Sequence, residues 1–243
     1  MLRKILGLGM ILSFVVAAVP SWAGEFWEDV DDLHFRGGGG GPMWFRFSPD
    51  LNKLNLKVRD IGLSNLKSSI SLWGGGGWGF VSDNFRIGGL GAGGSVTSKG
   101  IVDSVSKEVN FSIGFGGVTG EYVLRPINRV ELSFGALLGW GGVTIKLSKN
   151  KGPISWDGIW GDYKQPVGSV NTSSSLKNSF FGFMPWIGVK YSILEWMGIG
   201  ANIGYFQCWM DKNKWETDKL DLHDVPDIDL SDLMIRLDLT FGG

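Results

Sequence analysis

The chain has 243 residues, enough for one large domain or two small ones, and 39 of them are glycine. It carries 12 Trp and 15 Phe but only 19% charged residues, its formal net charge is −1, and its mean hydropathy is +0.08. A helical bundle is disfavoured because glycine is a poor helix former. The chain is also too apolar for general disorder and not basic enough for a nucleic-acid binder. We therefore expect an all-β protein.

The N-terminus, residues 1–23, has the pattern of a secretory signal peptide. Arg3 and Lys4 precede an uncharged, mostly apolar run over 5–19, which is short for a transmembrane helix because such a helix needs ~20 residues. Removal of the two basic residues would leave 21 basic (23 − 2) and 24 acidic residues, a net charge of −3. We assign 24–33 to an acidic periplasmic segment and 34–243 to the folded domain.

Eight stretches alternate between apolar and small or polar residues with period two, which predicts β-strands. They cover 34–48, 69–81, 85–97, 109–116, 130–140, 181–191, 197–206 and 233–241. Their apolar faces include Val109, Phe111, Ile113 and Phe115, the even positions from Val130 to Trp140, and Leu233, Ile235, Leu237, Leu239 and Phe241. The alternation changes parity at Gly116-Gly117 and at Gly141-Gly142, so we expect a bulge at each place.

The connections between these stretches alternate in length. Short turns lie at 82–84, 125–128 and 195–196, and longer links lie at 49–68, 98–106, 148–176 and 211–230. In an antiparallel meander this places every short turn at one end and every long loop at the other, as in membrane barrels with short periplasmic turns and long external loops. We predict an eight-stranded antiparallel up-and-down transmembrane β-barrel whose apolar faces point to lipid.

Aromatic residues gather near the strand ends, which predicts two interfacial girdles. The girdle at the short turns would hold Phe80, Phe85, Tyr191, Trp196 and Phe241, and the girdle at the long loops would hold Phe47, Phe180 and Trp209.

The signal peptide, the eight alternating segments and the terminal stretch Leu233–Phe241 resemble the small eight-stranded outer-membrane proteins of the OmpA/OmpX type. The resemblance implies residence in the cell outer membrane, with the lipid bilayer as a partner. It also implies that the barrel-assembly machinery reads the C-terminal strand through its final aromatic residue. Gly242 and Gly243 after Phe241 depart from this pattern, as do the runs Gly37–Gly41 and Gly74–Gly77. Homo-oligomer formation is left open.

Charged residues on the presumed inner face predict a polar network in the lumen. They are Arg46, Arg86, Glu131, Lys190, Arg236 and Asp238. An unpaired buried charge is costly, so these groups should pair with one another or meet water. An eight-stranded barrel has room only for side chains or one small ligand. We therefore favour a network that fills the barrel over the lining of a small-solute pore.

Other motifs give weaker signals. Gly89–Gly94 fits G-x-G-x-x-G but has no helix signal after it, so no nucleotide cofactor is expected. The acidic stretch 221–232 lacks the EF-hand pattern, so no metal is expected. Cys208 is the only cysteine, which excludes an intramolecular disulfide. The segment 50–61 fits a short helix and an extended ordered loop equally well.

The chain has two histidines, His34 and His223, which should lie at opposite ends of the barrel. His223 stands beside Asp221 and Asp224, and it is the candidate residue if the chain is a lipid-modifying enzyme. We expect no catalytic residue, because a lone loop histidine is usually solvated. The expected role is structural or interactive, through the external loops. A soluble lipocalin-like carrier of an apolar ligand is a further alternative, and it requires the apolar face of Leu233–Phe241 to point inward.

Overall fold

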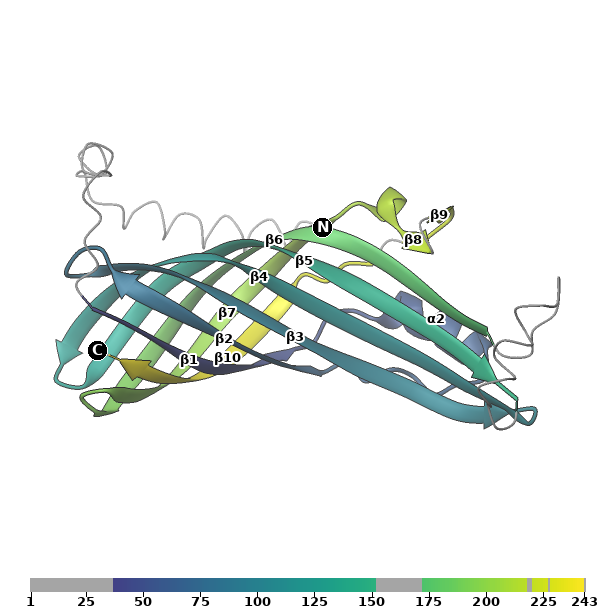
Figure 1. The fold of residues 1–243 in the computed structure, drawn as a ribbon, viewed down its shortest axis with the longest axis horizontal. Helices are drawn as coiled ribbons and strands as arrows, with labels where there is room; N and C mark the ends of the chain where they lie inside the picture. The colour runs from purple at the N-terminus through teal and green to yellow at the C-terminus, as the bar shows by residue number, and fades with distance from the viewer. Residues whose placement is uncertain (1–36, 152–171, 218–219, 227, 243) are drawn as a thin grey trace, which may run out of the picture. The chain divides into compact units, whose positions relative to one another are not determined.

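The computed structural model describes residues 37–151, 172–217, 220–226 and 228–242. The predicted signal peptide and the periplasmic segment 24–33 lie outside these residues. The described strands form one antiparallel sheet (Figure 1). Within the described ranges, no helix has the length and apolar character needed to cross a membrane.

The sheet contains ten strands, and the described chain also has one α-helix and one 3-10 turn. The elements are β1 Gly38–Phe47, α2 Asn52–Asp60, β2 Ile70–Phe80, β3 Phe85–Val102, β4 Val105–Ile127, β5 Val130–Asn150, β6 Thr172–Leu194, β7 Met197–Met210, η3 Lys212–Lys214, β8 Glu216–Thr217, β9 Leu220–Asp221 and β10 Asp232–Gly242.

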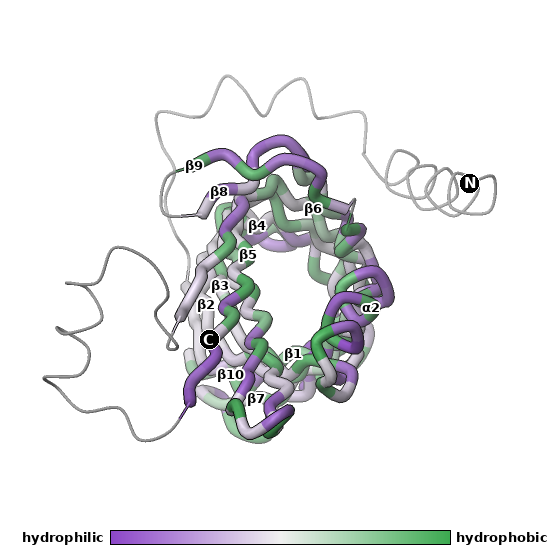
Figure 2. Tube along the Cα trace, turned by 90° about the vertical axis from the view of Figure 1, so that its right-hand side faces the viewer, coloured by the Kyte–Doolittle hydropathy of each residue, from purple (hydrophilic) through white to green (hydrophobic). Residues whose placement is uncertain are grey.

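Eight of the strands close into a ring. Each of β1 to β6 pairs with the next strand in chain order, and β10 closes the ring by pairing with both β7 and β1. The two-residue strands β8 and β9 are not ring members; they extend the sheet from β6 near its loop-side end. Figure 2 views the ring end-on. The predicted eight-stranded antiparallel barrel is confirmed by this pairing.

One predicted long loop is wrong. The stretch 98–106 belongs almost entirely to strands, because β3 runs to Val102 and β4 begins at Val105. Only Asp103 and Ser104 separate them, with φ angles of 52° and 61°. Positive φ at both central residues defines the type I′ turn, whose twist suits a tight hairpin. The hairpin of β3 and β4 therefore forms a long extension at the loop-side end.

The two predicted bulges are also wrong. The β4–β5 pairing runs without interruption through Gly116↔Trp140 and Gly114↔Gly142, and its register shifts only near the short turn, between Leu124 and Ile127. The predicted lipid-facing set on β4 is reversed as well, because these side chains are buried in the interior: Val109, Phe111, Ile113 and Phe115. Both predictions failed for the same reason. Along β4 and β5 the apolar side chains change from the outward to the inward face, while the strand pairing continues without a bulge.

Strand β5 shows this inversion most clearly. Its outward positions are apolar from Val130 to Trp140 and become polar at Thr144, Lys146 and Ser148. Its inward positions change in the opposite sense, from Glu131 and Ser133 to buried Leu137, Val143 and Ile145. The short-turn half of the barrel thus has an apolar outside and a polar inside, whereas the loop-side half has the arrangement of a soluble protein.

The early glycine runs allow close approach between strands. A Cβ atom on Gly76, which points inward, would lie 2.6 Å from the carbonyl oxygen of Gly89 on β3. A Cβ on Gly39 would lie 2.6 Å from the carbonyl oxygen of Phe241 on β10. Real Cβ atoms do not approach backbone this closely, so any larger residue would push these strands apart. Glycine here permits the tight coiling that a small closed ring requires.

The β1–β2 connection contains a helix, so the helical alternative for 50–61 is the observed one. Leu51, Leu54 and Val58 are buried in the core at helical spacing. The Nζ of Lys107 donates to the carbonyl oxygen of Ile61 at 2.9 Å, just past the last helical turn. The hydroxyl of Ser98 donates to the carbonyl of Ser64 at 2.6 Å. Helix α2 is therefore fastened to the β3–β4 extension (Figure 1).

Candidate functional site

A cluster of five charged side chains fills the short-turn half of the barrel; we call it the charged cluster. Its members are Arg86 on β3, Glu121 and Arg125 on β4, Glu131 on β5 and Lys190 on β6. Arg86 donates to Glu121 through Nε at 2.9 Å and through Nη2 at 2.5 Å. The Glu131 carboxylate forms ion pairs with three cations. Its oxygens lie 3.0 Å from the Nζ of Lys190, 3.2 Å from the Nε of Arg125 and 3.4 Å from the Nη1 of Arg86.

Register places these groups together. Arg86 is directly opposite Glu121, and Glu131 is directly opposite Lys190. On the far side, Trp78 of β2 receives two cations on its ring. The guanidinium of Arg86 lies 4.5 Å and the Nζ of Lys190 lies 5.1 Å from the ring centroid. These cation–π contacts link β2 to β6 across the lumen. The cluster has three cations and two anions, and the electron-rich face of the Trp78 ring partly stabilises the excess positive charge.

A second polar group lies on β7 and β10. The Nε of Arg236 donates to the Oδ1 of Asp238 at 3.1 Å, and the Nδ2 of Asn202 donates to the same oxygen at 2.7 Å. The guanidinium of Arg236 lies 5.0 Å from the centroid of the Trp186 ring. Arg236 and Asp238 therefore belong to the lumen, as expected, but they form a separate pair.

Arg46 is the one predicted lumen residue that lies elsewhere. Its side chain is exposed, and its Nε donates to the hydroxyl of Ser69 at 3.1 Å. The neighbours Phe45 and Phe47 point inward instead and are completely buried. The register places Arg46 opposite Ile235, which also points outward. The expectation that Arg46 joins the lumen network is wrong. The glycines at the start of β1 have no side chains, so the sequence does not show which residues of this strand point inward.

Five phenylalanine rings meet across the lumen between the charged cluster and α2; we call them the phenylalanine plug. They are Phe45 and Phe47 from β1, Phe115 from β4, Phe180 from β6 and Phe206 from β7. Phe206 is central, with ring centroids at 5.1 Å from Phe115 and 5.8 Å from both Phe47 and Phe180. These contacts join strands from opposite sides of the ring, so side chains occupy the barrel interior at this level.

The outside of the short-turn half is an apolar belt. Leu233, Ile235 and Leu237 on β10 are 57%, 45% and 46% exposed, although all three are large and apolar. The same holds on β5 for Phe134, Leu138 and Trp140. The soluble carrier predicted the opposite orientation for the β10 face. A continuous outer surface of this kind is stable only in a hydrocarbon environment.

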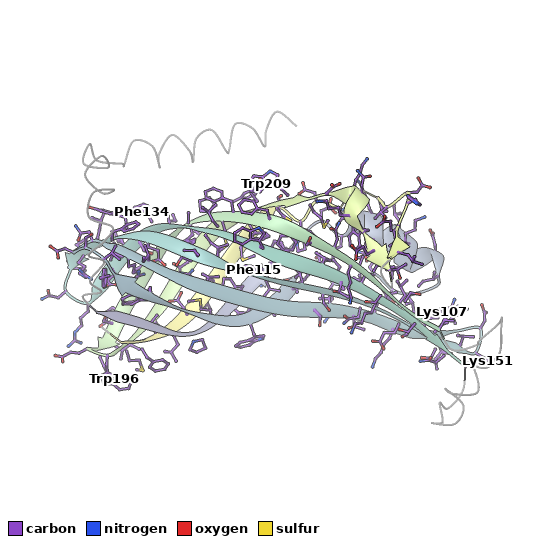
Figure 3. The ribbon with its side chains drawn as sticks, turned by 45° about the horizontal axis from the view of Figure 1, so that its top comes forward. Lys107, Phe115, Phe134, Lys151, Trp196 and Trp209 are labelled. Atoms are coloured by element: carbon purple, nitrogen blue, oxygen red, sulfur yellow. The ribbon has the colours of Figure 1, made fainter. Side chains whose placement is uncertain are left out.

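Aromatic side chains mark both edges of the belt. Trp140, Phe181 and Trp209 form one group at the loop-side edge, with 5.7 Å between successive ring centroids. Trp196 stacks on Phe241 at the short-turn edge, at 6.2 Å. Figure 3 shows Phe134, Trp196 and Trp209 on the outside of the ring. Three predicted girdle members point inward and are corrected: Phe47, Phe80 and Phe180.

A closed ring with an apolar belt satisfies every condition for spanning a bilayer with strands, because closure leaves no unpaired strand edge within the membrane. On β5 the belt spans Val130 to Trp140, the length of ~9–11 tilted residues that a crossing strand needs. The chain forms an outer-membrane β-barrel. The predicted location in the outer membrane follows from this architecture.

No family model matches the chain, and no curated protein matches it. Similar solved structures include the outer membrane protein OprG from Pseudomonas aeruginosa, with 12% identity, a TM-score of 0.49, and coverage of 85% of this chain and 95% of that one. Ail, the attachment invasion locus protein of Yersinia pestis, has 13% identity, a TM-score of 0.38, and coverage of 85% and 97%.

The outer membrane protease OmpT from Escherichia coli has 9% identity, a TM-score of 0.40, and coverage of 88% and 99%. The assignment of the ring and the belt rests on the strand pairing and exposure of this chain itself.

His223 lies exposed between β9 and β10, and it makes no hydrogen bond or ion pair with the described part of the chain. Asp221 and Asp224 beside it are exposed too. No group of three or more metal-ligating side chains occurs within the described ranges. A catalytic role for His223, and the expectation that the chain has no catalytic residue, both stay predictions. His34 lies outside the described residues.

Sequence reasoning missed several members of the lumen groups. Glu121 and Arg125 follow Gly116-Gly117, where the alternation in β4 changes. Beyond that point the sequence pattern did not indicate which residues point into the lumen. If the odd-numbered residues are taken to point inward along all of β4 from Val109 onward, Glu121 points into the lumen, opposite Arg86. Trp78 and Asn202 gave no signal of their own, because their role depends on the cations and carboxylate they face.

Proposed function

We propose that the chain is a non-conducting outer-membrane barrel that acts through its loop-side end, in a structural or interaction role. The observation that carries this proposal is the phenylalanine plug, in which rings from β1, β4, β6 and β7 contact one another across the lumen. The charged cluster fills the barrel on the short-turn side of the plug, and α2 packs on its loop side. A small-solute pore would require these groups to move.

The loop-side end is the part with folded structure outside the belt. It includes α2, the β3–β4 extension and the β8–β9 segment, whose exposed residues are mostly polar apart from Leu56, Ile101 and Leu220. A chain that only anchored itself in the membrane would not need a hydrophobic core beyond the bilayer. This core holds the extension in one shape, which favours presentation of a defined surface to a partner.

Planar bilayer recording tests the proposal. The full chain, refolded and inserted into bilayers, should produce no stepwise conductance, whereas the variant F115A/F206A should conduct if it stays folded. Migration on gels with and without heating reports whether each protein is folded. Regular conductance steps from the unaltered chain would overturn the proposal and would favour the pore.

The C-terminal strand supports a second, narrower proposal, that the barrel-assembly machinery acts on β10. Strand β10 is the closing strand, and Phe241 stacks on Trp196 at the edge of the belt. The change F241A should lower the amount of heat-modifiable barrel in the outer-membrane fraction, while F134A, at another exposed aromatic of the belt, should not. Equal yields for the two variants would contradict this proposal.

A further inference from the structure

Arg46 is a charged side chain on the lipid-facing side of β1. It is directly opposite Ile235 of β10, and Trp44, two residues earlier on the same face, is directly opposite Leu237. Both β10 residues belong to the apolar belt, with 45% and 46% of their surfaces exposed. Arg46 therefore stands at the loop-side edge of the belt. A charge in such a position is costly unless it reaches a polar partner.

The guanidinium of Arg46 is only partly used within the chain. Its Nε donates to the hydroxyl of Ser69 at 3.1 Å, and it forms no ion pair within the described part of the chain. Its cross-strand neighbours are Ser71 and Ile235, and neither is acidic. The two Nη groups remain available as donors. Because a guanidinium binds phosphate through two parallel N–H···O bonds, this side of Arg46 fits a phosphate group.

An apolar groove adjoins Arg46 on its short-turn side. The groove has a volume of about 580 Å³ and an almost entirely apolar lining. Side chains of five strands contribute to it, among them Trp44, Trp73, Val189, Tyr191, Ala201 and Leu237. Trp44 connects the two features, because it lines the groove and precedes Arg46 by two residues on the same face of β1.

The small side chain of Ala201 accounts for the recess in the belt. One row of directly opposed residues crosses the belt here, in the order Trp73, Trp44, Leu237, Ala201 and Val189. The other four side chains are larger than the methyl group of Ala201, so the surface is hollowed between them. Because the row lies in the belt, hydrocarbon rather than water fills the hollow.

The two features together select one kind of occupant. A groove of this volume is as large as the pockets that hold small ligands, about 300–1,000 Å³. The groove matches an acyl chain, and the guanidinium at its loop-side end matches a phosphate. Trp44 and Trp73 lie between the two, where tryptophan is favoured at the boundary of hydrocarbon and headgroups. A phosphate-bearing lipid has its charge and its apolar part in this same order.

We propose that this surface binds one phosphate-bearing lipid of the loop-side leaflet. Arg46 pairs with the phosphate, and one acyl chain lies in the groove over Ala201. The site includes residues of β1 and β10, the pair that closes the ring, so the bound lipid also stabilises ring closure. The inference goes beyond the proposed function, because it concerns the lipid-facing side of the barrel and not its loop-side end.

Native mass spectrometry in a maltoside detergent, which contains no phosphate, tests the site. The refolded full chain is titrated with dipalmitoyl phosphatidic acid or with dipalmitoylglycerol, which has the same acyl chains without the phosphate. The unaltered barrel should retain one phosphatidic acid at concentrations at which it retains no dipalmitoylglycerol. R46Q removes the charge-assisted hydrogen bonds and A201F fills the hollow, so each should weaken retention about tenfold.

Two variants on β5 serve as matched controls. K146Q removes an exposed outward lysine beyond the belt, and A136F adds a ring to the lipid-facing side away from the groove. Both should retain phosphatidic acid as the unaltered chain does, and heat-dependent migration on gels reports that all four variants are folded. Equal retention of the two lipids by the unaltered chain, or unchanged retention in either R46Q or A201F, would overturn the proposal. Neither result would bear on conductance, which tests the proposed function separately.

Discussion

Glu131 and Lys190 stand directly opposite each other on β5 and β6, with the Lys190 Nζ 3.0 Å from the Glu131 Oε2. Both side chains are largely shielded from solvent, each 12% exposed, and the same carboxylate also forms ion pairs with Arg86 and Arg125. One anion thus faces three cations, of which Lys190 and Arg86 lie in the barrel interior and Arg125 is about half exposed. The charged cluster depends on Glu131 more than on any other member, because Glu121 pairs with Arg86 alone.

The change E131Q should therefore destabilise the barrel. It leaves Lys190, Arg86 and Arg125 with only Glu121 as a counter-charge, and removing one partner from a buried ion pair costs about 3–5 kcal/mol. Urea unfolding in lipid vesicles measures the loss in the free energy of unfolding. The control E195Q, at an exposed turn, should change it by well under about 1 kcal/mol. Equal stabilities for the two variants would show that the cluster contributes little.

The phenylalanine plug gives a second prediction. F206A removes the ring that contacts Phe47, Phe115 and Phe180, and truncating a fully buried phenylalanine costs about 3–5 kcal/mol. F134A, on the lipid-facing surface of β5, leaves no internal cavity and should cost much less. The comparison uses the same unfolding measurement. A larger loss for F134A would mean that the interior is not packed as described.

The edge of the belt can be tested on a single strand. Val118 and Ser106 both point outward from β4, but only Val118 lies within the belt. An arginine facing lipid near the bilayer centre costs about 2–4 kcal/mol, whereas one in water costs little. Val118 is opposite Leu138, between the centre of the belt and its loop-side edge, so V118R should lower the free energy of unfolding in vesicles by a smaller amount, about 1–3 kcal/mol, and S106R should leave it nearly unchanged. Similar losses would place both positions in one environment.

The attachment of α2 gives a fourth prediction. K107M removes the hydrogen bond to the carbonyl of Ile61, and a hydrogen bond of this kind contributes about 0.5–1.5 kcal/mol. The β1–β2 connection should then open more often, so trypsin should cut after Lys57 or Arg59 up to about tenfold faster. K99M, which changes an exposed lysine of the same hairpin, serves as the control. Unchanged cleavage in K107M would contradict the role assigned to this bond.

Much of the fold follows from the sequence, because lipid imposes a strict rule on strands that cross it. The outward faces of β5 and β10 were predicted correctly from alternation alone, since every second residue within the belt must be apolar. The prediction failed for Val109 to Phe115 of β4, where the strand leaves the membrane and the same rule acts in reverse. A change of polarity without a change of register is indistinguishable from a bulge in one sequence.

The lumen groups were predictable only in part. Four of the predicted lumen residues could be recognised because a charged side chain in a lipid-crossing strand is costly unless it faces the interior and is paired there. They are Glu131, Lys190, Arg236 and Asp238. Arg46 has the same appearance, yet it points outward, because the glycines before it give no parity. The pairing of Arg86 with Glu121 depends on the β3–β4 register, which no local pattern specifies.

The central claim is that strands such as β5 keep one register while the polarity of their two faces inverts near Gly141. Single nitroxide or fluorescent labels in a C208S background test it directly, with cysteines placed at Leu138, Val143 and Ser148 and with lipid-phase and aqueous quenchers. The account predicts lipid-phase quenching at 138, aqueous quenching at 148 and protection from both at 143. Lipid-phase quenching at 143 would reveal a parity change at Gly141-Gly142 and would contradict the account.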